Sequence, residues 1–169
     1  MRLHIEWIDK TWKSTLVKYL RVELNLLVVK FSQPKTEDAF SEYIEFFWTV
    51  KDNKKETRND NIICDRSRIW ENVYWPVYRK KWLKKFQIKK LDESCKANWD
   101  LIIRCSTDKW MIKKKFKEDN ETFAQLKDVW RLERYFRKTL KWLKTTVIEY
   151  DRQLWNMESI KDIILALKK

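Results

Sequence analysis

The stretch "IEWIDKTWKST", residues 5 to 15, joins two different patterns of secondary structure. Residues 2 to 7 alternate between apolar and polar side chains, which predicts a β-strand. From residue 13 to residue 25, apolar side chains recur at the spacing of one helical face, which predicts an amphipathic helix. The stretch is therefore expected to form the turn that carries the first strand into the first helix.

Trp7, Trp12, Lys13 and Ser14 follow the spacing of a phosphate-binding loop, G-x-x-x-x-G-K-[ST], with tryptophan at both glycine positions. In such a loop, backbone N–H groups at a helix N-terminus bind phosphate oxygens. The lysine offsets phosphate charge, and the hydroxyl ligates Mg²⁺. The alternative interpretation is that Lys13 and Ser14 simply begin an ordinary helix.

Glycine is absent from the chain, whereas tryptophan occurs 11 times. Average usage predicts roughly 12 glycines at this length, so the excess of tryptophan approximately matches the deficit of glycine. We infer that most tryptophans occupy glycine positions, through a recoded stop codon or deliberate substitution. The segment Asn98-Trp99-Asp100 is one such position, because Asn-Gly-Asp would form a turn before an apolar run.

The composition indicates one domain spanning residues 1–169, long enough to bury a core. A net charge of +13 favours anionic partners, although lysines spread over solvated surfaces would give the same number. We expect no membrane span, because no run of about 18 apolar residues exists. We also expect no signal peptide, because the N-terminus lacks the basic-then-apolar layout.

The chain has three cysteines, an odd number, and their spacing is not that of metal ligands: Cys64, Cys95 and Cys105. They indicate reduced thiols in a cytosol-like compartment. His4 is the only histidine, which argues against histidine-based catalysis or metal binding. The expected location is the cytoplasm, or the host cytoplasm for a viral protein.

Strand and helix patterns alternate along the rest of the chain. Strands are predicted at residues 26–31, 61–64, 101–105 and 146–150. Helices are predicted from residue 36 onward and at residues 77–91, 121–143 and 160–167, and the polar stretch 51–61 is predicted to be a loop. This alternation is typical of a three-layer α/β fold, with about five parallel strands and helices on both faces.

Asp65-Arg66 directly follows the third predicted strand, residues 61–64. An acidic side chain there can assist Mg²⁺, and the arginine can bind a substrate phosphate. With glycine at Trp7 and Trp12, residues 5–15 resemble the E-G-x-D-x-x-G-K-S-T loop of thymidylate kinases. "DRSRIWENVYWPVYR", residues 65–79, is similar to phage and viral members of these P-loop deoxynucleoside monophosphate kinases. "NWDLIIRC", "TTVIEYD" and the last helix extend the resemblance over nearly the whole chain.

The resemblance implies a role for each matched residue. Lys13, Asp65 and Arg66 would be catalytic, and Ser14 and Asp65 would hold Mg²⁺. The ATP phosphates would lie against Trp7, Ile8, Asp9, Lys10, Thr11, Trp12, Lys13, Ser14 and Thr15. The acceptor would contact Asp9, Arg66, Tyr74, Tyr78 and Arg79. Lys113, Lys114, Lys115 and Lys117 would belong to a basic lid over ATP, although a solvated basic helix has the same pattern. Residues 36–58 match the family's arginine-bearing helix poorly, so base specificity stays open.

The implied function is transfer of a phosphoryl group from ATP, with Mg²⁺, to a deoxynucleoside monophosphate such as dTMP. The partners would be these nucleotides rather than nucleic acid or membrane, and a homodimer stays open. Two alternatives are a deoxynucleoside kinase of the same fold and a non-catalytic basic module for nucleic acid. As written, the chain is expected to fold but to bind nucleotide poorly, because Trp7 and Trp12 carry indoles where backbone must approach phosphate.

Overall fold

Five parallel strands form the central sheet of the computed structural model, in the order β2-β5-β1-β6-β7. The described residues are 1–6, 13–30, 39–51, 54–57, 61–66, 73–74, 77–78, 83–106, 108–118, 126–152 and 154–167. The sheet strands are β1 (Arg2–Glu6), β2 (Leu27–Lys30), β5 (Ile62–Asp65), β6 (Leu101–Ser106) and β7 (Thr146–Asp151). The predicted α/β fold with about five parallel strands is confirmed.

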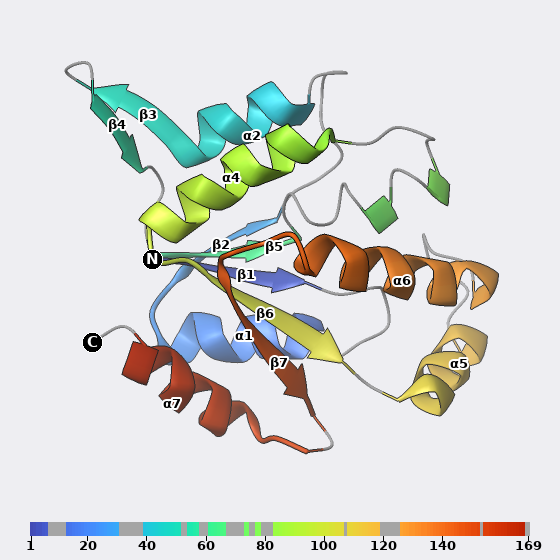
Figure 1. Cartoon of the computed structure of the whole chain (residues 1–169). Coiled ribbons are helices and arrows are strands. Elements are labelled where there is room, and N and C mark those ends of the chain that lie inside the picture. The colour runs from blue at the N-terminus through green and yellow to red at the C-terminus, as the bar shows by residue number, and fades with distance from the viewer. Residues whose placement is uncertain are drawn as a thin grey trace.

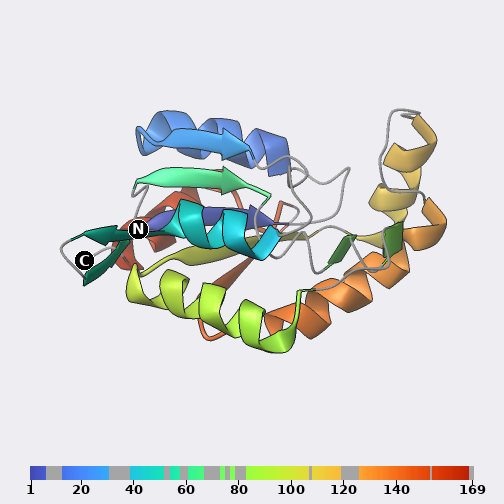
Figure 2. The same cartoon turned by 90° about the horizontal axis from the view of Figure 1, so that it is seen from above.

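Helices cover both faces of this sheet (Figures 1 and 2). One face carries α1 (Lys13–Glu23) and α7 (Met157–Leu167), and the other carries α2 (Ala39–Phe47) and α4 (Lys85–Ala97). Beyond the carboxyl ends of the strands lie α5 (Lys109–Glu118) and α6 (Val129–Leu140), the latter preceded by the 3₁₀ turn η1 (Leu126–Asp128). Among the described residues, no helix is both long and apolar enough to cross a membrane.

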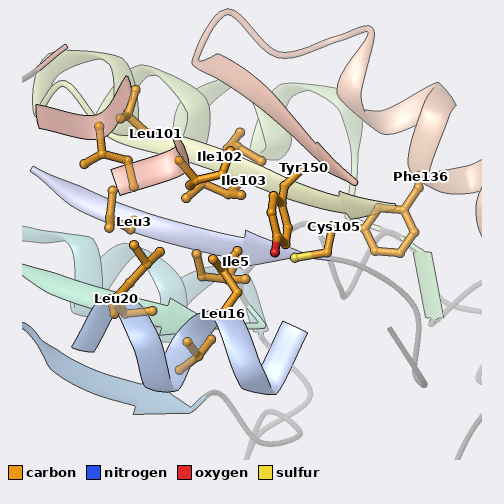
Figure 3. Packing of buried hydrophobic residues seen from close by; sticks show 14 of the residues in the cluster. Leu3, Ile5, Leu16, Leu20, Leu101, Ile102, Ile103, Cys105, Phe136 and Tyr150 are labelled. Carbon is orange, nitrogen blue, oxygen red and sulfur yellow. The ribbon is translucent and has the colours of Figure 1, made fainter. Parts of the chain in front are cut away.

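The hydrophobic core surrounds the central strand β1, which is buried along its entire length. Leu3 and Ile5 of β1 pack with Leu16 and Leu20 of α1, and all four side chains are fully buried (Figure 3). The helical spacing of residues 13–25 in the sequence predicts this contact, since it places the apolar side chains of α1 on one face. Packing of α1 against β1 fixes the position at which the helix begins.

The parallel register brings the carboxyl ends of all five strands to one edge of the sheet. Ile5 of β1 lies beside Asp65 of β5, and Glu6 lies beside Arg104 of β6. Open α/β sheets bind ligands at this edge. The residues that follow β1 and β5 in the chain therefore leave the sheet at neighbouring points.

Three secondary-structure predictions are wrong in their bounds or type. The predicted loop 51–61 contains an antiparallel hairpin, β3 (Trp48–Lys51) with β4 (Lys54–Thr57). The helix predicted at 77–91 corresponds to α4, which begins at Lys85 because the Gln87 side chain accepts a hydrogen bond from the Lys84 N–H at 2.7 Å. The helix predicted at 121–143 is confirmed by α6, but it is preceded by the 3₁₀ turn η1 and ends at Leu140; residues 121–125 lie outside the described residues.

Trp99 occupies the left-handed backbone region, with φ at 56°. Its N–H donates to the Lys96 carbonyl at 3.1 Å, and the Asp100 N–H donates to the Cys95 carbonyl at 2.9 Å. This pair of bonds is the Schellman motif, which ends a helix with a left-handed residue that is usually glycine. The predicted turn at Asn98-Trp99-Asp100 is confirmed, and its geometry favours glycine at position 99.

Candidate phosphate-binding site

Lys13 and Asp65 form an ion pair at the carboxyl edge of the sheet. Lys13 is the first residue of α1, and Asp65 is the last residue of β5. The Lys13 Nζ donates a hydrogen bond to Asp65 Oδ1, and only 5% of Lys13 and 9% of Asp65 are exposed. A largely buried lysine directly after the expected phosphate loop provides a positive charge where a polyphosphate would lie.

Ser14 and Thr15 lie in the first turn of α1, and both are exposed. The first backbone N–H groups of a helix have no partner within the helix, and the helix dipole makes this end electropositive. No acidic residue lies in the first turn of α1 to offset that potential. The start of α1 is therefore suited to an anion, and the Ser14 hydroxyl and Asp65 carboxylate are oxygen ligands of the kind Mg²⁺ prefers.

Arg66 follows Asp65 and has a left-handed backbone with φ at 65°. Its N–H donates to the carbonyl of Ile5 at 3.4 Å, which ties the end of β5 to the end of β1. A non-glycine residue in this region costs free energy, and such residues are frequent at functional sites. The turn at Arg66 leads the chain away from the sheet immediately beside the Lys13–Asp65 pair.

Tyr74 and Tyr78, two of the residues expected to contact the acceptor, stack on each other with ring centroids 6.0 Å apart. Tyr74 is only 2% exposed and belongs to the core, whereas Tyr78 is half-buried. The Tyr78 hydroxyl donates to Asp128 Oδ2 at 3.3 Å, just before α6. Tyr78 thus connects this segment to the helix at the carboxyl edge, and Tyr74 serves packing.

The four lysines expected in a lid lie in α5. This helix follows β6 directly and lies beyond the carboxyl ends of the strands (Figure 1). Lys113 and Lys114 are exposed, and the Lys114 Nζ lies 5.3 Å from the centroid of the Trp110 ring. Lys115 and Lys117 belong to the same helix. The segment is helical and lies on the side of the sheet where a lid is expected, and its assignment as a lid stays a prediction.

Residues 7–12 and Arg79 lie outside the described residues. The roles expected for Trp7, Ile8, Asp9, Lys10, Thr11, Trp12 and Arg79 therefore stay predictions. Of the other expected residues, the structure brings Lys13 and Asp65 into contact and places Arg66 next to them in the chain.

Glu6 and Arg104 are two charged residues at the same edge that the sequence analysis did not identify. Glu6 ends β1, and its register partner Arg104 lies in the second half of β6; they are 0% and 7% exposed. The Arg104 Nη1 donates to Glu149 Oε1 of β7 at 2.5 Å, and Nη2 lies 4.0 Å from Glu133 Oε1 of α6. The available signal was a single charge late in an otherwise apolar strand, as in "LIIRC". Arg104 connects the sheet to α6, and Glu149 and Glu133 offset its charge.

Cys105 lies beneath this edge and is 1% exposed. Burial raises the pKa of its thiol to about 12, although the positive charge of Lys13 opposes the shift. The thiol therefore stays neutral at physiological pH. Cys105 is not suited to act as a nucleophile at the site.

No family model and no curated protein matches the sequence. Among solved structures, the fold is similar to YorR from Bacillus subtilis, which was crystallised in complex with phosphorylated GDP. The TM-score is 0.79 at 21% identity, over 99% of this chain and 96% of YorR. The fold is also similar to a putative polyphosphate kinase 2 from Pseudomonas aeruginosa, with a TM-score of 0.54 at 15% identity, over 99% of this chain and 37% of that protein. The chain thus has a P-loop nucleotide kinase-like fold, and it spans little more than a third of the polyphosphate kinase.

Proposed function

We propose that this chain is a P-loop kinase that transfers a phosphoryl group from ATP to a deoxynucleoside monophosphate, with dTMP as the expected acceptor. The observation that carries the proposal is the buried Lys13–Asp65 pair, which lies at the carboxyl edge of the sheet immediately after a loop with phosphate-binding spacing. The fold likeness to nucleotide-binding proteins supports it, and so does the resemblance of residues 5–15 and 65–79 to thymidylate kinases. We also propose that residues 1–169 act as one domain, because the core cluster joins residues from β1 to α7.

In this proposal, catalysis rests on positioning and electrostatics rather than on a covalent enzyme intermediate. The start of α1 binds phosphate oxygens, and Lys13 offsets negative charge on the transferred group. Ser14 and Asp65 would hold the Mg²⁺ that accompanies ATP, and this ion would supply further charge neutralisation. Arg66 orients the acceptor phosphate, and α5 limits access of water to the site.

The Lys13–Asp65 pair has a consequence for nucleotide binding. Lys13 must turn from Asp65 towards the phosphates when ATP binds, and Asp65 then becomes available to the metal. Because both residues are largely buried, separating them without replacing the lost partner would be costly. ATP and Mg²⁺ are therefore expected to bind together more tightly than either does alone.

Trp7 and Trp12 determine which form of the chain can carry out this reaction. An indole at either position would occupy space where a phosphate-binding backbone has to approach phosphate closely. The proposal assigns the activity to the chain with glycine at positions 7 and 12. The chain with tryptophan at positions 7 and 12 is expected to have the same fold and little kinase activity.

The test is an acceptor panel with the Trp7→Gly, Trp12→Gly double variant, ATP and Mg²⁺. ADP formation and the phosphorylated product are measured by chromatography. The acceptors in the panel are dTMP, thymidine, the other deoxynucleoside monophosphates, GMP and polyphosphate. Guanine nucleotides are included because YorR was crystallised with phosphorylated GDP, and polyphosphate because of the second fold likeness.

Formation of dTDP from dTMP would support the proposal. Phosphorylation of thymidine without phosphorylation of dTMP would instead favour a deoxynucleoside kinase, and phosphorylation of GMP alone would refute the base assignment. Polynucleotide binding without ADP formation in any reaction would contradict the kinase proposal. That outcome would favour a non-catalytic binding module.

A further inference from the structure

The only histidine of the chain lies next to a cysteine and an aspartate inside the protein. His4 comes from β1, Cys95 from α4, and Asp100 from the turn before β6. The His4 Nε2 lies 3.1 Å from Asp100 Oδ2 and 3.6 Å from Cys95 Sγ, and the three side-chain atoms all lie within 4.8 Å of one another. His4 and Cys95 are 0% exposed and Asp100 is 2% exposed.

The two separations from His4 Nε2 are close to those between the ligands of a tetrahedral zinc ion. Zinc binds histidine nitrogen at about 2.0–2.1 Å, carboxylate oxygen at about 2.0–2.2 Å and thiolate sulfur at about 2.3 Å. A tetrahedral angle then separates nitrogen from oxygen by about 3.3 Å and nitrogen from sulfur by about 3.6 Å. We propose that His4, Cys95 and Asp100 bind a thiophilic divalent metal ion of the zinc class.

Cys64 would supply a fourth donor after a change of its side-chain rotamer, because the cluster of ligand atoms within 4.8 Å of one another contains only His4, Cys95 and Asp100. It is the register partner of His4 on the neighbouring strand β5, so both side chains leave the same face of the sheet. Cys64 is fully buried and has no disulfide partner. Two cysteines, one histidine and one carboxylate make up a donor set suited to zinc.

The charges of the buried groups also balance around a divalent ion. The guanidinium of Arg2 is fully buried and donates from Nε to Asp100 Oδ2 at 2.8 Å. Arg2 and a divalent metal together carry three positive charges, and the Asp100 carboxylate with two thiolates carries three negative ones. Both thiols would lose their protons to solvent as the metal binds.

The alternative is a network of hydrogen bonds without metal. Asp100 Oδ1 already accepts from the Arg2 N–H and from Asn98 Nδ2, both at 2.8 Å. These bonds fix the orientation of the carboxylate, and Oδ2 then faces His4. A metal would replace the proton between His4 and Asp100 as well as the thiol protons, and the bonds from Arg2 and Asn98 would hold the carboxylate in place.

The cluster is separate from the phosphate-binding site. Arg2 begins β1 and Asp100 precedes β6, so the cluster belongs to the amino-terminal half of the sheet, whereas Asp65 ends β5 at the carboxyl edge. A metal here would join β1, β5, α4 and the turn before β6. Its role would be structural, and it would be incorporated as the chain folds, because solvent does not reach these side chains.

The test is the metal content of the protein purified from cells grown with added zinc, measured by mass spectrometry after desalting. About one zinc per chain is expected for the unmodified protein. Protein prepared with cobalt instead is expected to show the absorption of a cobalt–thiolate bond. A metal-free protein that gives no cobalt–thiolate absorption would overturn the proposal, whatever its kinase activity.

Two variants assign the metal to these residues. Cys95→Ala is expected to lose the metal and the cobalt–thiolate absorption. Cys105→Ala is the matched control, because Cys105 is equally buried but lies at the other edge of the sheet, and it is expected to keep the metal. Equal metal content in both variants would refute the assignment to Cys95. Because the spectrum of the unmodified protein is informative by itself, a variant that fails to fold leaves the test intact.

Discussion

Replacing Trp99 with glycine is expected to stabilise the protein. Trp99 has φ at 56° in the turn that ends α4, and 80% of its side chain is exposed. The left-handed conformation costs a residue with a Cβ about 1–2 kcal/mol. Glycine removes that cost but gains flexibility in the unfolded chain, which offsets about 0.5–1 kcal/mol. Because little indole surface is buried, the net gain in the free energy of unfolding is about 1 kcal/mol.

The assay is chemical denaturation followed by circular dichroism, with thermal melting as a second readout. A gain of this size would raise the Tm by about 2–4 °C in a chain of this length. Trp99→Ala is the first control, because alanine removes the indole but keeps the Cβ, and its stability should stay close to that of the unmodified chain. Trp110→Gly is the second control, since Trp110 is 64% exposed but lies in the α5 helix, where glycine costs up to about 1 kcal/mol. Equal effects of glycine and alanine at position 99, or a loss of stability with glycine, would refute the backbone argument.

Three further predictions concern acid stability, catalysis and the core. Burial raises the pKa of Asp100, but hydrogen bonds from His4 and Asn98 and the charges of His4 and Arg2 outweigh burial and lower the pKa to about 2. The ionised carboxylate therefore stabilises the folded state above pH 4. The free energy of unfolding should fall by roughly 2–3 kcal/mol as the pH drops towards 2. Asp100→Asn should remove most of this pH dependence in chelator-treated protein, and an unchanged acid transition would contradict the assignment. In the Trp7→Gly, Trp12→Gly double variant, Lys13→Ala should lower kcat about 100- to 1,000-fold. Lys18→Ala, on the exposed side of α1, is the control and should leave kcat unchanged. A near-normal kcat in Lys13→Ala would exclude the role proposed for Lys13. Leu16→Ala should lower the free energy of unfolding by about 2–5 kcal/mol, measured with urea, and a cost below 1 kcal/mol would show that α1 does not pack on β1 as described.

The sheet could be predicted because its strands carry short apolar runs between helical patterns. The hairpin of β3 and β4 was missed because Lys54–Thr57 is polar at every position and gives no alternation. The sequence feature that indicates a hairpin here is the pair Asp52-Asn53. Lys51 pairs with Lys54, so two residues connect the strands, and aspartate and asparagine are favoured in two-residue connections.

The candidate site was predicted where its residues are adjacent in the chain, as at Lys13-Ser14 and Asp65-Arg66. Arg104 was missed because its significance depends on Glu149 and Glu133, which are distant in sequence and meet it only in the fold. The same reason explains why His4 was not associated with Cys95. Spacing along the chain shows a metal site only when the ligands come from one local segment.

The central claim is that residues 5–15 form a phosphate site in which tryptophan replaces glycine. Calorimetric titration with MgATP tests it most directly, in the chain as written, in the Trp7→Gly, Trp12→Gly double variant, and in that variant with Lys13→Ala. We expect binding by the double variant, weak binding by the unmodified chain and by each single glycine variant, and loss of binding in the double variant when Lys13 is replaced by alanine. MgATP binding by the unmodified chain as tight as that of the double variant would contradict it.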